Sequence, residues 1–357
     1  MTLITSVLAP CQLRSAPSLA VGAAAALLCC LSLAISCQDD DTTVPAGAMI
    51  EDGPRPCLTD CTSRIGIVSA FGAEADILLA ETADKEQYVI NGKVFTSGVL
   101  RDNPIVIVLS GVSVINAAMT TQVMIDHFGV THLIMSGIAG GLSPDNHVGD
   151  VLVPERWTMP LEAYFSGDSQ VPVPCGTPGE LGCLGLRLAE AMSGPGSDYS
   201  GTGIFMRDTE VLSAASAPTP EFKFAFDVDP EMLEVAQGIT PDLQRCGETQ
   251  PDVCVEGQPE LKIVSTGMSG SMFIANPAYR DYVYGTIGAE VVDMETAALG
   301  QVAYANGIPY LAFRSLSDLA GGGEEGASVG AFFGSGLAEA NEARVTLAFL
   351  EAWAARD

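Results

Sequence analysis

The chain has 357 residues, 48% of them hydrophobic, and this length suits one large α/β domain better than two small ones. Its 16 basic residues stand against 44 acidic residues, which gives a formal net charge of −28. A surface this acidic repels phosphodiester backbones and anionic lipid headgroups, which argues against nucleic acid as a partner.

An apolar run, residues 19–35, follows a leader whose only charge besides the N-terminus is Arg14. The run is short for a membrane-spanning helix and ends in small residues before Cys37 and a polar stretch. We predict a lipoprotein-type signal peptide over 1–36, with Cys37 lipidated, so that the protein is exported to the cell envelope or periplasm and meets the membrane only through this anchor. An uncleaved anchor or an ordinary cleaved signal is the alternative, because the leader is weakly basic and Ala34 is an imperfect lipobox residue.

Residues 37–62 are acidic, rich in Pro and Gly and without periodicity, which predicts a tether to a folded domain over 63–357. Six cysteines outside the leader and the lipidation site form three local pairs: Cys57, Cys61, Cys175, Cys183, Cys246 and Cys254. An oxidising compartment favours short-loop disulfides, although six cysteines allow fifteen connectivities. A metal site is disfavoured, because no histidine lies near these pairs at a ligand spacing.

The domain opens with a strand from Arg64 that runs into the start of a helix, with Glu74 in its first turn. An acid at this place normally compensates the helix dipole at the surface. A buried strand follows from Ile105, and Ser113 is a plausible N-cap for a helix to about Phe128. The next strand, from Thr131, leads into a glycine-rich turn that either lets backbone amides approach a ligand or is ordinary turn chemistry.

Residues 155–260 are read as an elaboration over one end of the sheet, because their apolar periodicity is short and interrupted. Helices are possible near residues 181–192 and 230–238. A strand from Leu261 follows, and residues 326–354 are predicted to form a long, closing amphipathic helix.

Residues 290–323 predict a strand, a helix that stops at Asn306-Gly307, and a second strand over 308–313. Ser317 and Asp318 come just past that second strand, and Glu295 follows the first. Ligands of open α/β sheets bind beyond the carboxyl ends of the strands. Glu295 and Asp318 are therefore placed where a small molecule would bind.

The same stretch carries a resemblance. Asp-Met-Glu-Thr-Ala-Ala, from Asp293, and Arg-Ser-Leu-Ser-Asp-Leu-Ala, from Arg314, resemble the signature of the nucleoside phosphorylase superfamily. The most similar branches are the methylthioadenosine/S-adenosylhomocysteine nucleosidases and the plant bark and vegetative storage proteins. The resemblance spans roughly residues 64–350 and implies an α/β fold, three-layer αβα with a mixed central sheet. It also implies a nucleoside as the small-molecule partner, no cofactor, and a homo-oligomer.

Catalytic roles follow from the resemblance. Glu74 matches the acid that deprotonates the attacking water. Asp318, if protonated, would donate to purine N7 and so neutralise the departing base, with Ser317 orienting it. These roles describe an N-ribosyl hydrolase, which releases free base and sugar from purine nucleosides or from methylthioadenosine-type thionucleosides.

Substrate-binding roles follow in the same way. Glu295 would accept hydrogen bonds from the ribose hydroxyls as positive charge develops on the sugar, Met294 would pack under the sugar, and Phe273 would stack on the base. On sequence alone, an ordinary core position for Phe273 is about as plausible. The loop with Ala139 and Gly140 resembles the central loop of the superfamily.

Ile138 departs from the pattern, because bacterial nucleosidases and many phosphorylases have a hydroxyl residue at this position. The Gly-Ile-Ala-Gly form is similar to the plant storage branch. A phosphate site also needs convergent Arg donors, and only Arg101 and Arg314 are candidates. Arg314 lies inside the strand pattern, where a structural ion pair is at least as plausible a role. We therefore expect hydrolysis. A phosphate-dependent phosphorylase and a non-catalytic nucleoside-binding or storage-type protein remain the alternatives.

Overall fold

The structure, a computed structural model, describes residues 57–160, 162–168, 170–171, 187–192, 197–321 and 335–356. The predicted signal peptide, the lipidation site Cys37 and the Cys175–Cys183 pair lie outside these residues. Within the described part, no helix combines the length and the apolar composition needed to cross a membrane.

A mixed β-sheet forms the centre of the domain. Its first strands are β1 (Arg64–Ser69), β2 (Ala83–Ile90), β3 (Lys93–Leu100), β4 (Asn103–Leu109) and β5 (Val130–Gly141). β1 lies between β4 and β5 and is parallel to both, whereas β2 and β3 form an antiparallel hairpin next to β4. The hairpin turns at Asn91 and Gly92, which both have positive φ, as a tight turn between twisted strands requires.

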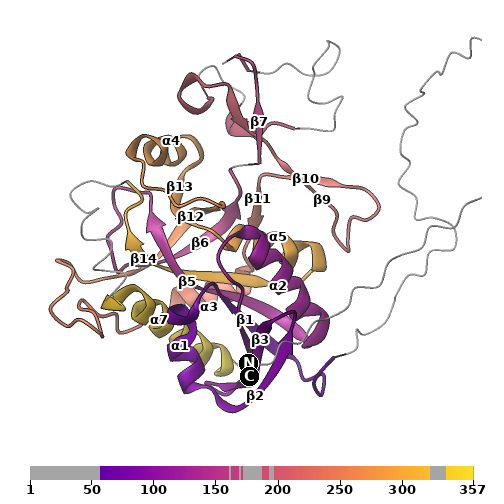
Figure 1. Cartoon of the computed structure of the whole chain (residues 1–357), viewed down its shortest axis with the longest axis vertical. Coiled ribbons are helices and arrows are strands. Elements are labelled where there is room, and N and C mark those ends of the chain that lie inside the picture. The colour runs from indigo at the N-terminus through magenta and orange to yellow at the C-terminus, as the bar shows by residue number, and fades with distance from the viewer. Residues whose placement is uncertain are drawn as a thin grey trace, which may run out of the picture. The chain divides into compact units, whose positions relative to one another are not determined.

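The later strands of the sheet close on themselves. They are β6 (Val151–Thr158), β11 (Ala225–Asp227), β12 (Leu261–Ser269), β13 (Ala289–Asp293) and β14 (Tyr310–Asp318). β13 pairs with β5 and β12, β12 pairs with β6, and β14 pairs with both β6 and β5. β5, β13, β12, β6 and β14 therefore form a ring, with β11 paired to the outside of β6, and the ring places the ends of β5, β13 and β14 together (Figure 1).

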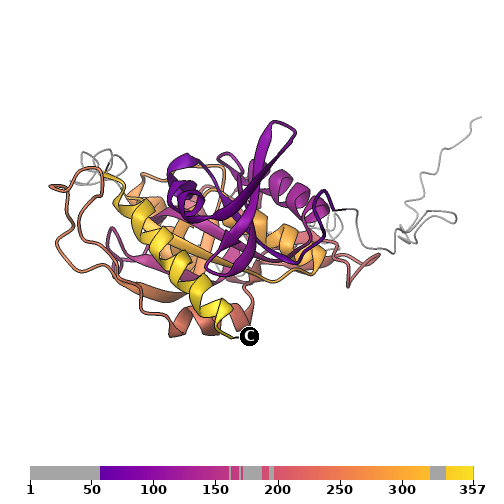
Figure 2. The same ribbon diagram turned by 90° about the horizontal axis from the view of Figure 1, so that it is seen from below.

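Helices cover both faces of the sheet. They are α1 (Gly72–Glu81), α2 (Val114–His127), α3 (Pro230–Gly238), α4 (Pro277–Ile287), α5 (Thr296–Asn306) and α7 (Leu337–Ala354). α7 packs against α1, β5 and β14 on one face, and α2 packs against α5 on the other (Figure 2). The three-layer αβα architecture with a mixed sheet is thus confirmed, while the closed ring of strands was not predicted.

The closing helix α7 differs from the prediction. It was expected to be amphipathic, but within residues 337–354 the buried positions include Asn341 and Glu342 as well as apolar ones. The Asn341 amide donates to main-chain oxygens of Gly149 and of Gln244, so the loops that hold these two residues also cover the helix. The amphipathic prediction is therefore wrong, because tertiary contacts surround the helix on several sides.

Two glycine-rich or polar segments that were expected beyond strand ends belong to the strands themselves. β5 continues through Gly137 to Gly141, where it pairs with β13 and β14. β14 likewise runs on to Ser317 and Asp318 instead of ending near Phe313. The predicted glycine-rich turn is therefore wrong. Glycines are needed here for close approach of other groups and not for a turn.

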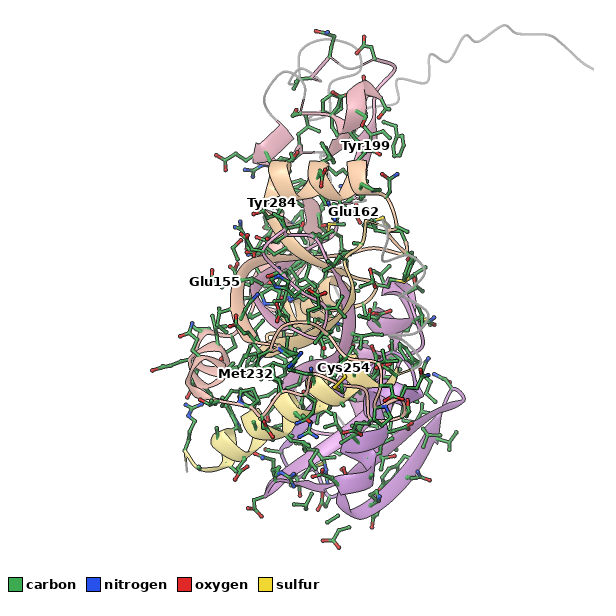
Figure 3. All side chains as sticks on the ribbon, turned by 90° about the vertical axis from the view of Figure 1, so that its left-hand side faces the viewer. Glu155, Glu162, Tyr199, Met232, Cys254 and Tyr284 are labelled. Carbon is green, nitrogen blue, oxygen red and sulfur yellow. A yellow bond between two sulfur atoms is a disulfide. The ribbon has the colours of Figure 1, made fainter. Side chains whose placement is uncertain are left out.

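The segment over 155–260 contains short strands and little helix. β7 (Ala163–Phe165) pairs with β8 (Ile204–Met206), and β9 (Thr209–Val211) pairs with β10 (Glu221–Lys223). Of the helix expected near residues 181–192, the described part holds a short 3₁₀ turn, Glu190–Met192, whereas α3 has the predicted bounds of 230–238. Tyr199, labelled in Figure 3, packs its ring against Tyr279 and Tyr282 of α4.

Candidate active site

A cavity of about 220 Å³ opens where β1, β5, β13 and β14 end. Every predicted catalytic or substrate-binding residue lines it: Glu74, Ile138, Ala139, Gly140, Phe273, Met294, Glu295, Ser317 and Asp318. The ring of strands explains this convergence, since Val292 pairs with Gly140 across β13 and β5, and Asp318 pairs with Gly140 across β14 and β5. Segments that are far apart in the sequence thus supply one site.

Glu74 lies at the third position of α1 and is almost fully buried, with 1% of its surface exposed. Its Oε2 accepts hydrogen bonds from the main-chain N–H of Ala70 at 2.6 Å and of Phe71 at 3.3 Å, while Oε1 accepts from Ile138 N–H at 2.8 Å. Burial raises the pKa of Glu74, and Arg314 and these amides act against that rise. The surface role that its sequence position allowed is excluded.

Arg314 is a buried residue at the centre of the site. It is fully buried in β14, and its guanidinium binds Asp293 Oδ2 at 2.7 Å, Glu295 Oε2 at 3.3 Å and Glu74 Oε1 at 3.6 Å. Sequence reasoning considered Arg314 for phosphate or for a structural ion pair, but did not identify these partners. The available signal was an Arg inside an apolar strand, which is seldom buried unless it is paired.

Asp293 is a second residue that sequence reasoning missed. Its carboxylate accepts hydrogen bonds from the hydroxyls of Ser269 and Thr296 and from the main-chain N–H of Glu295, at 3.1 Å for the last. It therefore fixes the start of α5 and holds Arg314 at the same time. Its place directly before Met294 and Glu295 was the only indication in the sequence.

Glu295 is held from two sides. Its Oε1 accepts from the main-chain N–H of Ser113 at 2.8 Å, and its Oε2 binds Arg314. Burial raises the pKa of Glu295 to about 7, the charge of Arg314 opposes that rise, and the nearby Asp293 carboxylate adds to it. A carboxyl group fixed in this way presents its remaining lone pairs to the cavity.

Gly137 makes the Glu74–Arg314 contact possible. A Cβ atom at this position would lie 2.3 Å from Glu74 Oε1 and 2.4 Å from Arg314 Nη1, which no real structure tolerates. The glycine in β5 therefore leaves the space in which the carboxylate and the guanidinium meet.

Asp318 occupies the other end of the cavity without a cation. Its Oδ1 accepts from Ala320 N–H at 2.8 Å, and its Oδ2 lies 3.0 Å from the Ser317 hydroxyl. Burial raises the pKa of Asp318, against the effect of these hydrogen bonds. The Ser317 hydroxyl has one proton, which it can donate to Asp318 Oδ2 at 3.0 Å or to the main-chain oxygen of Ala139 at 3.2 Å, so these two acceptors share one donor.

Apolar side chains form the remaining walls. Phe273 keeps 63% of its surface exposed although it lines the cavity, so it is not an ordinary core residue. Met294 and Ile138 flank the carboxylates, and Ile138 offers no side-chain hydrogen bond. Such a site binds a molecule with an apolar body and a few fixed polar groups.

No Lys or Arg belongs to the described residues that line the cavity. Arg101, the other phosphate candidate from the sequence, binds Glu81 at the protein surface, so this candidate is wrong. Arg314 is occupied by the carboxylates of Glu74, Asp293 and Glu295. Three carboxylates against one guanidinium leave a net charge of −2 if all are ionised, which repels phosphate.

Metal ligands do not cluster in the part of the chain that the structure describes, where no group of three His, Cys, Asp or Glu residues could hold an ion. Two predicted cysteine pairs, Cys57–Cys61 and Cys246–Cys254, lie at disulfide distance.

Comparisons with known proteins agree with this geometry. A family model described as "Phosphorylase superfamily" matches residues 64–351. The 5′-methylthioadenosine/S-adenosylhomocysteine nucleosidase of Oceanobacillus iheyensis is 24% identical over 258 residues, which are 72% of this chain and 86% of the relative.

Solved structures show the same fold. The corresponding nucleosidase of S. pneumoniae, solved with a transition-state inhibitor, has a TM-score of 0.55 at 22% identity and covers 82% of this chain and 100% of its own. The futalosine hydrolase of Helicobacter pylori has a TM-score of 0.55 at 21% identity and covers 84% of this chain and 100% of its own.

Proposed function

The chain belongs to the phosphorylase superfamily, and from this premise we propose that it hydrolyses the N-glycosidic bond of purine nucleosides or of methylthioadenosine/S-adenosylhomocysteine-type thionucleosides. One observation carries the proposal. Glu74, Glu295 and Asp318, from three distant segments, line one cavity whose described walls contain no cation. Nucleosidases among the relatives support the choice of substrate class.

Cleavage of a ribosyl C–N bond builds positive charge on the sugar and negative charge on the departing base. Asp318, whose pKa is raised by burial, acts as the acid that donates its proton to the purine ring nitrogen as the bond breaks, and Ser317 orients the carboxyl group. The electron pair of the C–N bond leaves with the base, which departs as a neutral purine.

The sugar is stabilised from the opposite end of the cavity. Glu295 accepts hydrogen bonds from the ribose hydroxyls, and these strengthen as the sugar becomes cationic. Its own position is fixed by Arg314 and by the Ser113 amide, so little reorganisation is needed in the transition state. Met294 and Phe273 supply apolar surface for the sugar and the base.

Water completes the reaction. Glu74 takes a proton from the water while the oxygen of the water forms the new bond to the sugar carbon, so the products are free purine and free sugar. One proton has left Asp318 and one has reached Glu74, and exchange with solvent after product release restores both groups. Ile138 and the net negative charge around Arg314 favour water over phosphate as the nucleophile.

The test uses the full-length protein, purified in detergent, with adenosine, inosine, methylthioadenosine or S-adenosylhomocysteine, each with and without phosphate. Free base and free sugar at a rate that does not depend on phosphate are expected. Phosphate-dependent release of a sugar 1-phosphate would instead identify a phosphorylase. A folded protein that binds nucleoside without turnover would be a binding or storage-type protein.

We also propose export and lipidation at Cys37, supported by the apolar run over 19–35 and by two cysteine pairs at disulfide distance. Mass spectrometry of the N-terminal peptide, with Cys37→Ala as the control, tests this.

A homo-oligomer is proposed as well, because apolar side chains next to the site are exposed, among them Ile115 at 68% and Met119 at 53%. Light scattering after size-exclusion chromatography measures its state.

A further inference from the structure

Ser113 has a backbone conformation that L-residues rarely adopt. Its φ is 93° and its ψ is 152°, a region that glycine populates easily and that serine avoids because of its Cβ. Ser113 stands at the N-cap position of α2, as the sequence predicted, but its side chain makes no capping hydrogen bond to the helix. Capping therefore does not explain why a serine is held in this conformation.

The conformation has a different consequence. It directs the Ser113 N–H to Glu295 Oε1 at 2.8 Å, although the two residues are 182 positions apart. The Ser113 hydroxyl contacts the hydroxyl of Ser271. Strained backbone that persists in a folded protein is characteristic of functional sites, where the surroundings hold it in place.

Both contacts act on walls of the cavity. Val112, next to Ser113, lines the cavity, and so do Met272 and Phe273, which follow Ser271. The contact between the two hydroxyls therefore joins two loops that face each other across the site. One loop leads from β4 to α2, and the other leads from β12 to α4.

The amide of Ser113 also limits the movement of Glu295. Arg314 binds Glu295 Oε2 at 3.3 Å but binds Asp293 more closely, at 2.7 Å. The guanidinium is thus shared, and it does not by itself fix both oxygens of Glu295. The Ser113 amide on Oε1 supplies the second point of attachment that sets the plane of the carboxylate.

We propose that Ser113 is a positioning residue, whose strained backbone aims its amide at Glu295 and whose hydroxyl, with that of Ser271, ties the two cavity loops together. The inference rests on the proposed function, since it takes Glu295 as the carboxylate that binds the sugar. The strained backbone of Ser113 lowers the stability of the protein, and in return it orients a carboxylate of the substrate site.

The variants Ser113→Ala and Ser113→Gly separate the two contributions. Both variants lose the hydroxyl and keep the main-chain N–H, but Ala keeps the strain at φ 93°, whereas Gly adopts this φ without strain. At an ordinary position Gly is less stable than Ala, but at φ 93° the order should reverse, so Ser113→Gly should have the higher Tm. Its kcat/KM should match that of Ser113→Ala within about twofold, and both should fall roughly three- to tenfold below the parent, because both variants keep the amide on Glu295 and lose the same hydroxyl.

Ser271→Ala is the matched control for the hydroxyl contact. It should lower kcat/KM by the same factor as Ser113→Ala, and the double variant should be no worse than either single variant, since both remove the same contact. Additive losses, or a Ser113→Ala enzyme as active as the parent, would overturn the inference.

Hydrogen exchange tests the amide contact without any ligand, which separates this inference from the proposed function. The amide of residue 113 should exchange slowly in the parent protein, in Ser113→Ala and in Ser113→Gly, and at least tenfold faster in Glu295→Ala, which removes the acceptor. Fast exchange in the parent, or exchange that Glu295→Ala leaves unchanged, would overturn the inference even in an active nucleosidase. Slow exchange in a protein without nucleosidase activity would leave the positioning of Glu295 established and the proposed function wrong.

Discussion

The two ends of the cavity hold carboxyl groups in opposite surroundings. At one end, Glu74 and Glu295 share the guanidinium of Arg314 with Asp293. At the other end, Asp318 has only a main-chain N–H and a hydroxyl as partners. Burial raises the pKa at both ends, but a cation opposes the rise only at the first. The two ends thus differ in their partners: Arg314 favours the ionised carboxylates that bases need, whereas the partners of Asp318 include no cation that would oppose its protonated form.

Removal of the shared cation should have the largest effect. Arg314→Met leaves the buried carboxylates of Glu74, Asp293 and Glu295 without their partner, and breaking a buried ion pair costs about 3–5 kcal/mol of stability. Chemical denaturation at pH 7 measures the loss. Arg101→Ala is the control, since its surface pair with Glu81 should contribute about 0–1 kcal/mol. Equal losses in the two variants would contradict the central role of Arg314.

Substitution of Asp318, the acid at the other end of the cavity, should lower activity but leave the stability of the fold nearly unchanged. Asp318→Asn cannot donate the proton, so kcat should fall by about 10²–10⁴-fold while Tm stays within a few degrees. The alkaline fall of the parent activity, caused by ionisation of Asp318, should also disappear from the residual rate. Asp252→Asn, at an exposed position, is the control and should keep full activity. An Asp318→Asn enzyme with parental kcat would show that the acid lies elsewhere.

Glu342 of α7 sharpens the comparison, because it is a buried acid outside the cavity. Its Oε2 has no hydrogen-bond partner among the described residues, and burial raises its pKa well above the ordinary value, with the negative charge of Glu74 adding to the rise. Because the pKa of Glu342 is higher in the folded than in the unfolded protein, its contribution to the free energy of unfolding is fully present below the unfolded-state pKa, near 4.5. That contribution is lost as the pH rises toward the folded-state pKa.

Glu342→Gln should therefore flatten the fall in Tm between pH 5 and pH 8. At pH 8 a gain of a few degrees is expected, since about 1 kcal/mol shifts Tm by ~2–4 °C in a domain of this size. Glu351→Gln, on an exposed position of the same helix, should leave the pH dependence unchanged. An identical pH dependence in the parent and in Glu342→Gln would mean that Glu342 does not titrate in this range.

The smallest effect on catalysis is expected at Ile138. Ile138→Ser introduces a hydroxyl beside Glu74 but adds no cation, so the nucleosidase rate should change only a few-fold and should remain independent of phosphate. The fold should lose about 2 kcal/mol from the smaller side chain, because Ile138 is buried but borders the cavity. Phosphate-dependent turnover in this variant would show that the hydroxyl alone decides the nucleophile, and not the charge around Arg314.

The sequence predicted the three-layer αβα fold because periodicity and helix stop signals are local. The strand after Arg64, the strand from Leu261 and the helix that ends at Asn306-Gly307 all lie where the pattern placed them. Elements whose surroundings are set by distant segments were predicted less well. The glycine-rich stretch from Gly137 is strand because β13 and β14 pair with it, and α7 is buried because the loop at Gln244 covers it.

The sequence by itself indicated which acids belong to the site: Glu295 and Asp318 by their places after predicted strands, and Glu74 only through the resemblance to the nucleoside phosphorylase superfamily. Only the tertiary structure decided how each acid is used. The partners of Arg314, the contact of Ser113 with Glu295 and the isolation of Asp318 depend on strand register and loop conformation between segments that are far apart in the chain. No local sequence pattern encodes the distances between these groups. Because the protonation state of a carboxyl group depends on the groups around it, that state is set by the tertiary structure.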